Sequence, residues 1–198
     1  MRLLETNFWI FPYEKYRKIL RYDYEFNASF RGVRKFKRGD YDKYELKYIK
    51  LYRRAQLSRG SIWFHYFFYR LKSFGLKTGI GLHDNLNIPP GLIIGHAGTI
   101  VINAGATFKG NLMLTHGVTI GRDIRGKHAG APSFGKNICI RCNSTVVGGI
   151  KIGDDVLIAP NTFVNFDVPS HSIVIGNPAT VHHRENATEG HIGYVMTN

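Results

Sequence analysis

The chain has 198 residues, enough for one domain with a small additional segment, and 43% of them are hydrophobic, which is ordinary for a globular protein. Two cysteines are too few for a disulfide scaffold, and the longest apolar aromatic run, 62–69, is far shorter than the about 20 residues of a membrane helix. The formal net charge is +13, of which +12 lies in residues 1–80, with 19 Lys or Arg against 7 Asp or Glu.

The N-terminal residues lack the order of a signal peptide, because Glu5, Pro12 and Glu14 interrupt it, and we expect a cytoplasmic protein. A run of positive charge is most often a solvated surface. Twelve net positive charges among aromatic residues nevertheless predict an anionic partner: a phosphorylated acceptor, a membrane surface or nucleic acid. Nucleic acid is the weakest of these alternatives, since no recognised nucleic-acid module signature is present.

Residues 1–79 are predicted to form a basic helical N-terminal segment. Apolar residues recur at helical spacing in the three stretches 13–20, 44–55 and 63–74. A basic loop, residues 31–38, separates the first two stretches, and Asp40 is a candidate N-cap for the second helix.

From Ile88 onward, apolar residues recur every six positions. The twelve repeat starts are Ile88, Ile94, Ile102, Phe108, Leu114, Ile120, Phe134, Ile140, Val146, Ile152, Ile158 and Val164. The spacing is interrupted by a two-residue insertion before Ile102 and an eight-residue insertion before Phe134. A period of six fits neither a helix nor a two-layer sheet. It predicts a parallel β-helix, in which each hexapeptide is one short strand plus a corner and three hexapeptides make one coil.

Residues three repeats apart should stack in one column, with neighbouring coils ~4.8 Å apart. His96, His116, Cys142 and Pro160 each lie two positions after a repeat start, so the two imidazoles should be near neighbours. A lone histidine is usually structural, but two in one open column are candidate catalytic groups. Zinc binding by this column is geometrically conceivable. We predict no metal, because no fourth ligand or carboxylate is evident.

The hexapeptide pattern of residues 80–181 resembles that of the left-handed β-helix acyltransferases. A more specific resemblance is to the serine acetyltransferase branch and the polysaccharide O-acetyltransferases similar to it. It rests on HAGTIVIN, GVTIG, a loop ending in Pro132 and VPSHSIVIGNPA. The resemblance implies a mainly β protein, a left-handed parallel β-helix after a helical N-terminal segment. It also implies a homotrimer and direct, metal-free transfer of an acetyl group from acetyl-CoA.

In the resembled enzymes, the histidine at the position of His96 is the general base that takes the proton of the acceptor hydroxyl. His116 is then an orienting group, or alternatively the base itself. The resemblance also implies that acetyl-CoA contacts Gly121, Arg122, Cys142, Ala159 and Pro160.

Three positions depart from the serine enzymes. Gly81 stands in place of the aspartate that pairs with the catalytic histidine, Gly95 in place of the acid that helps to hold the amino group of serine, and Ala131 in place of a second histidine. His128, in the same loop, and Asp84 remain as acceptor-binding candidates. Because both acidic positions are lost, we predict a sugar hydroxyl acceptor in capsular, exo- or lipopolysaccharide biosynthesis. An anionic or lipid-linked glycan would suit the basic segment, which could also associate with the inner face of a membrane.

Two other hypotheses stay open: a serine O-acetyltransferase of cysteine biosynthesis, and a non-catalytic β-helix that serves as a binding scaffold. The sequence determines neither the acceptor nor whether another acyl donor replaces acetyl-CoA. Residues 182–198 are predicted to be a C-terminal tail with no readable chemistry.

Overall fold

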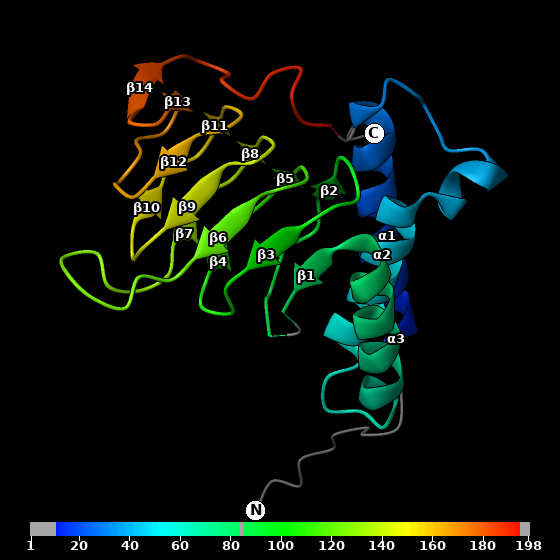
Figure 1. Ribbon diagram of the computed structural model, residues 1–198. Coiled ribbons are helices and arrows are strands. Elements are labelled where there is room, and N and C mark those ends of the chain that lie inside the picture. The colour runs from blue at the N-terminus through cyan, green and yellow to red at the C-terminus, as the bar shows by residue number, and fades with distance from the viewer. Residues whose placement is uncertain (1–10, 84, 195–198) are drawn as a thin grey trace, which may run out of the picture.

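The computed structural model describes residues 11–83 and 85–194, and it consists of a group of helices at one end of a β-helix (Figure 1). The helices are α1 (Tyr13–Phe30), η1 (Arg38–Asp42, a 3₁₀ helix), α2 (Tyr44–Leu57) and α3 (Trp63–Thr78). The three stretches of helical spacing therefore form the three α-helices. None of the helices in the described ranges is long and apolar enough to cross a bilayer.

Three sheets form the sides of the β-helix. The first contains β1 (Ile80–Leu82), β3 (Ile100–Ile102), β6 (Thr119–Gly121), β9 (Thr145–Val147) and β12 (Phe163–Val164). The second contains β4 (Thr107–Phe108), β7 (Ser133–Phe134) and β10 (Lys151–Ile152). The third contains β2 (Leu92–Ile94), β5 (Leu112–Leu114), β8 (Ile138–Ile140), β11 (Val156–Ile158), β13 (Ser172–Gly176) and β14 (Ala179–His183). All neighbouring strands are parallel except the terminal hairpin of β13 and β14.

The predicted left-handed parallel β-helix is confirmed. The repeat starts of the three sheets point into its core. All twelve are buried, and those on the third sheet pair in register, Ile94 with Leu114, Leu114 with Ile140 and Ile140 with Ile158. Ile124 is 73% exposed, because it lies in the long loop between β6 and β7. That loop projects from the side of the β-helix (Figure 1).

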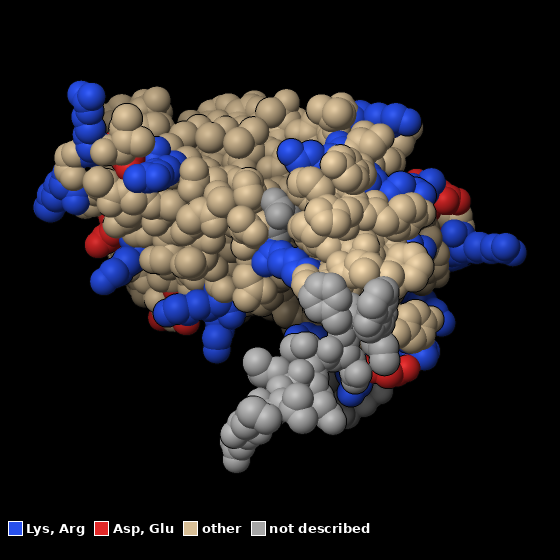
Figure 2. All heavy atoms as spheres, turned by 90° about the horizontal axis from the view of Figure 1, so that it is seen from below, with Lys and Arg blue, Asp and Glu red and all other residues tan. Residues whose placement is uncertain are grey.

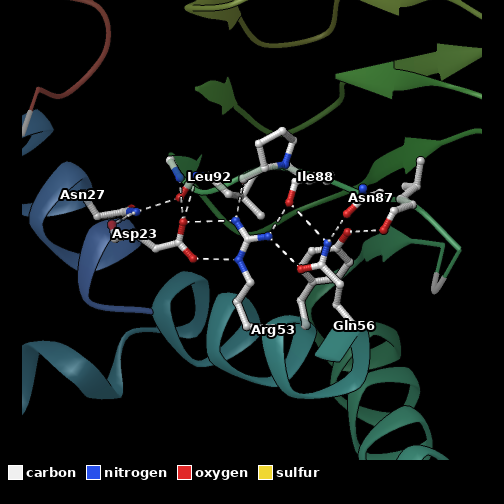
Figure 3. A network of polar contacts seen from close by, with 11 residues as sticks. Asp23, Asn27, Arg53, Gln56, Asn87, Ile88 and Leu92 are labelled. Carbon is white, nitrogen blue, oxygen red and sulfur yellow. Dashed lines mark hydrogen bonds and ion pairs between the residues drawn. The ribbon is translucent and has the colours of Figure 1, made fainter. Parts of the chain in front are cut away.

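A buried polar network joins the helices to the first coil (Figure 3). Arg53 on α2 and Asp23 on α1 are both 0% exposed and form a two-pronged ion pair, with Nε–Oδ2 and Nη2–Oδ1 distances of 2.7 and 3.1 Å. Asp23 also accepts the amides of Gly91 and Leu92, while Arg53 donates to the Ile88 and Pro89 carbonyls. The helices thereby satisfy backbone groups that would otherwise be unpaired at the end of the β-helix.

The C-terminal segment after β14 returns along the outside of the third sheet to α1 (Figure 1). The Asp155 carboxylate accepts hydrogen bonds from the Ala187 amide and from the amide and hydroxyl of Thr188, both residues being buried. Farther on, the amide of Tyr194 donates to the Ser29 hydroxyl on α1. The described part of the tail therefore packs on the domain. Together with α1, it covers outward-facing apolar side chains of the third sheet, namely Ile93, Met113, Cys139 and Leu157.

Candidate active site

The histidine pair lies on the corner between the third and the first sheets. His96 follows β2 and His116 follows β5, and the pairing of Ile94 with Leu114 places the two histidines one above the other. Their ring centroids are 6.1 Å apart, the planes are inclined by 65°, and both residues are exposed. The insertion before Ile102 makes this coil 20 residues long in the sequence, and the fold accommodates it without loss of register.

Gly98 lies directly against His116 of the next coil. Its φ is +145°, and a Cβ built there would lie 2.8 Å from the Cβ of His116. Only a residue without a side chain fits this approach. The corner is therefore shaped around His116.

Two charged side chains from the helical segment hold the turn that carries His96. Oε1 of Glu45, in the first turn of α2, accepts the amide of Ala97 at 2.9 Å. Nη2 of Arg31, which follows the C-terminus of α1, donates to the carbonyl of Ile94 at 3.2 Å. Burial lowers the pKa of the Arg31 guanidinium, and the nearby carboxylate of Glu45 counters part of that effect. The base candidate thus sits on a turn fixed on both sides by α1 and α2.

Within the described ranges, neither imidazole has a hydrogen-bond partner, so the base candidate lacks the carboxylate that pairs with it in the resembled enzymes. Gly81 is exposed on β1, and Gly95 packs closely against two side chains of the next coil. A Cβ on Gly95 would lie 2.9 Å from Cγ2 of Thr115 and 3.2 Å from Cε of Met113. A larger residue at position 95 would therefore require the side chains of Thr115 and Met113 to move.

The histidine column continues with Cys142 and Pro160, as the register requires. The backbone amide of Asn143 donates to the His116 carbonyl, and the amide of Asn161 donates to the Cys142 carbonyl. Ala159, one residue before Pro160, is half-buried. Cys142 is half-buried, whereas Cys139 lies under the tail, and burial raises the pKa of the Cys139 thiol to about 12.

The other predicted site residues lie at a different corner of the β-helix. Gly121 is the last residue of β6 and Arg122 follows it, at the corner after the first sheet rather than before it. His128 lies at that corner too, where its carbonyl accepts the amide of Gly149 at 2.7 Å. A single chain thus does not bring His128 to the His96–His116 pair. Asp84 lies outside the described residues.

No group of three or more His, Cys, Asp or Glu among the described residues is placed to hold a metal ion. Lys and Arg side chains are spread over both the helical and the β-helix end of the face seen in Figure 2, and few acidic ones accompany them. On this face the positive charge forms no single patch.

The fold is that of solved hexapeptide-repeat left-handed β-helix acyltransferases, and curated relatives are of the same kind, which confirms the family resemblance. The curated proteins that match are serine acetyltransferases. The chain is 37% identical over 103 residues to serine acetyltransferase 4 of Arabidopsis thaliana, a match that covers 51% of this chain and 28% of that protein. It is 34% identical over 113 residues to the Staphylococcus epidermidis enzyme, covering 57% and 53%, and 33% identical over 102 residues to that of Helicobacter pylori, covering 52% and 60%. The chain thus matches less than two thirds of each relative.

Solved structures agree on the fold. The serine acetyltransferase of Neisseria gonorrhoeae superposes with a TM-score of 0.72 at 20% identity, over 86% of this chain and 66% of that one. The soybean apoenzyme gives 0.72 at 22% identity, over 85% and 69%. The Brucella abortus enzyme in complex with coenzyme A gives 0.71 at 20% identity, over 86% and 69%. No protein-family model matches the chain.

These matches correct the predicted acceptor. A sugar hydroxyl of a polysaccharide was predicted because Gly81 and Gly95 lack the acids of the serine enzymes, yet the matching proteins are serine acetyltransferases, which favours the alternative hypothesis. The inference considered acids only within the β-helix, whereas the carboxylate of Glu45 on α2 also reaches the turn that carries His96. Sequence reasoning missed Glu45 and Arg31, since no local pattern links a residue of the helical segment to a turn 52 or 63 residues away. Neither a glycan partner nor membrane association has support in these matches.

Proposed function

We propose that this protein is a serine O-acetyltransferase that uses acetyl-CoA as the donor. The observation that carries the proposal is the exposed His96–His116 pair, 6.1 Å apart, on a β-helix segment that is 33–37% identical to serine acetyltransferases. An alcohol is a weak nucleophile, so the reaction needs a base placed beside the acceptor hydroxyl. An exposed imidazole on a rigid corner meets this need.

The reaction is a direct acyl transfer. The serine hydroxyl oxygen attacks the thioester carbonyl carbon while His96 accepts its proton, and a tetrahedral oxyanion forms. The C–S bond then breaks, O-acetylserine is released, and the proton held by His96 returns to the coenzyme A thiolate. His116, in the next coil, is positioned to orient the hydroxyl or to donate to the oxyanion.

The placement of the predicted acetyl-CoA contacts supports a homotrimer. Cys142, Ala159 and Pro160 continue the histidine column on one edge, whereas Gly121 and Arg122 lie on another edge. A threefold assembly can set the first edge of one copy against the second edge of its neighbour and enclose the donor between them. The long loop between β6 and β7 would then bring His128 to the neighbour's histidine pair.

Steady-state assays test this function. Purified protein should release coenzyme A from acetyl-CoA in the presence of serine, with a mass gain of one acetyl group on serine. His96→Ala should lower kcat by about 10²- to 10⁴-fold, the usual contribution of a general base, and His116→Ala should have a smaller effect. Size-exclusion chromatography with light scattering should give a trimer. Faster turnover with sugar acceptors than with serine, or full activity of the His96→Ala/His116→Ala double variant, would refute the proposal.

A further inference from the structure

A groove lies between α1 and the corner of the β-helix that leads from the second sheet to the third. Its volume is about 500 Å³, which falls within the range of about 300–1,000 Å³ that small-molecule sites occupy. It is lined by one side of α1 and by the turns before β2, β5 and β8. The histidine column and residues 121–128 lie at the other two corners, so the groove is separate from the candidate active site.

The lining of the groove is basic. It holds Lys18, Lys109 and Lys136 and no acidic residue. All three lysines are exposed, and among the described residues none of their ammonium groups forms an ion pair or a hydrogen bond. Asp154 lies outside the lining, where its Oδ1 accepts the backbone amide of Lys136 at 2.8 Å. Three cations around one space repel one another unless an anion binds between them.

The strand register brings two of these lysines together. Phe108 of β4 pairs with Phe134 of β7, so the turn of residues 109–110 lies beside the turn of Lys136 in the next coil. A Cβ on Gly110 would lie only 3.0 Å from Cγ of Lys136, and the lysine side chain therefore passes directly over the neighbour of Lys109. Lys18 joins them from α1, which forms the other wall of the groove.

The groove also offers a neutral donor and an apolar surface. Nδ2 of Asn111 donates to Oδ1 of Asn137 at 2.9 Å, while Oδ1 of Asn111 accepts the Tyr22 hydroxyl at 3.4 Å. The amide nitrogen of Asn137 has no acceptor within the described ranges, so it is available to a ligand. Ile19, Tyr22 and Pro90 supply the apolar part of the lining.

We propose that this groove binds a nucleoside diphosphate, an organic phosphate with one flat and largely apolar part. Lysine ammonium groups bind phosphate as point charges, and those of Lys109 and Lys136 hold the phosphate groups. The base lies against Tyr22 and Pro90, with Lys18 at the α1 side of the groove. The inference goes beyond the proposed function, because no residue of the groove takes part in the acetyl transfer.

Isothermal titration of the full chain with UDP at low ionic strength tests the proposal. UDP lacks the adenine and the pantetheine arm of acetyl-CoA. We expect UDP to bind, and uridine and inorganic pyrophosphate each to bind at least about 10-fold more weakly, since each lacks one part of the ligand. Lys109→Gln/Lys136→Gln should raise the Kd for UDP by about 10-fold or more, the effect of losing hydrogen bonds to charged groups.

Two further variants make the test specific. Asn137→Asp still accepts the hydrogen bond from Asn111, and aspartate tolerates the φ of 56° at this position. It should raise the Kd for UDP, because a carboxylate replaces the amide donor. Lys72→Gln/Lys77→Gln is the matched control, since it removes the same charge from two exposed positions on α3, and it should keep the wild-type Kd.

The outcomes separate a built site from general attraction to positive charge. A wild-type protein that does not bind UDP overturns the proposal, and so does an unchanged Kd in Lys109→Gln/Lys136→Gln, which would place UDP elsewhere. An equal rise of the Kd in both double variants overturns it as well. Pyrophosphate that binds as tightly as UDP refutes the apolar contact. None of these titrations measures acetyl transfer, so their result is independent of the proposed function.

Discussion

Loss of the ion pair between Asp23 and Arg53 should release the helical segment from the β-helix. Both side chains are fully buried, and the Asp23 carboxylate accepts four hydrogen bonds, two from Arg53 and one each from the amides of Gly91 and Leu92. Asp23→Ala leaves a buried guanidinium without its counter-charge, which costs about 3–5 kcal/mol. Because domains are stable by only about 5–15 kcal/mol, this is a large fraction of the free energy of unfolding.

The double variant Asp23→Leu/Arg53→Met makes the prediction specific. Replacing a buried ion pair by apolar side chains is often neutral or stabilising. Here the pair also forms hydrogen bonds with two backbone amides and two backbone carbonyls. Each buried polar group that loses its partner lowers the stability by about 1–3 kcal/mol. We therefore expect the double variant to remain at least about 2 kcal/mol less stable than wild type.

Urea unfolding followed by circular dichroism measures both changes, with the slope m compared between variants to detect a change of the unfolding reaction. Gln56→Ala is the control, because its side chain joins the network at an edge, through Nη1 of Arg53 and the Asn87 side chain. A double variant with the wild-type urea midpoint would refute the reasoning, since it would show that the end of the β-helix does not depend on these two side chains for its hydrogen bonds.

Three further predictions concern single sites. The raised pKa of Cys139, about 12, keeps its thiol protonated at pH 8, so iodoacetamide should modify Cys142 first, as read by peptide mass spectrometry. Burial acts to raise the pKa of Asp155, but hydrogen bonds from the tail and from a histidine lower this pKa on balance. The tail should therefore stay docked above pH about 4 and loosen as the pH falls further. Asp155→Asn should reproduce that loosening at pH 7, as faster hydrogen exchange in residues 187–188. Gly98→Ala should displace His116 and lower kcat, and the positive φ at this position should also lower the free energy of unfolding.

Each of these has an outcome that contradicts it. Equal alkylation rates of the two cysteines in the folded protein would show that Cys139 is not shielded. Unchanged exchange of residues 187–188 in Asp155→Asn, with Asp154→Asn as the control one position away, would show that the carboxylate does not hold the tail. Wild-type kcat in Gly98→Ala would show that the close approach to His116 has no part in turnover.

The periodicity of the sequence determined the β-helix and the histidine column. Each hexapeptide buries its own start against the same position of the next coil, so a local pattern repeated twelve times specifies a fold whose contacts are almost all between equivalent positions. The positions of His96 and His116 two residues after their starts were enough to predict that the rings would be neighbours, because stacking transmits the register from one coil to the next.

Only the tertiary structure decided what surrounds that column. The helices dock through Asp23 and Arg53, the tail is held by Asp155, and Glu45 reaches the turn of His96, and each contact joins segments that share no repeat. A repeat period in the sequence predicts only how successive repeats of the chain pack against one another. A side chain that contacts a distant segment only once produces no such pattern, which is why the histidine column could be predicted from the repeats while the contact of Glu45 with the turn of His96 could not.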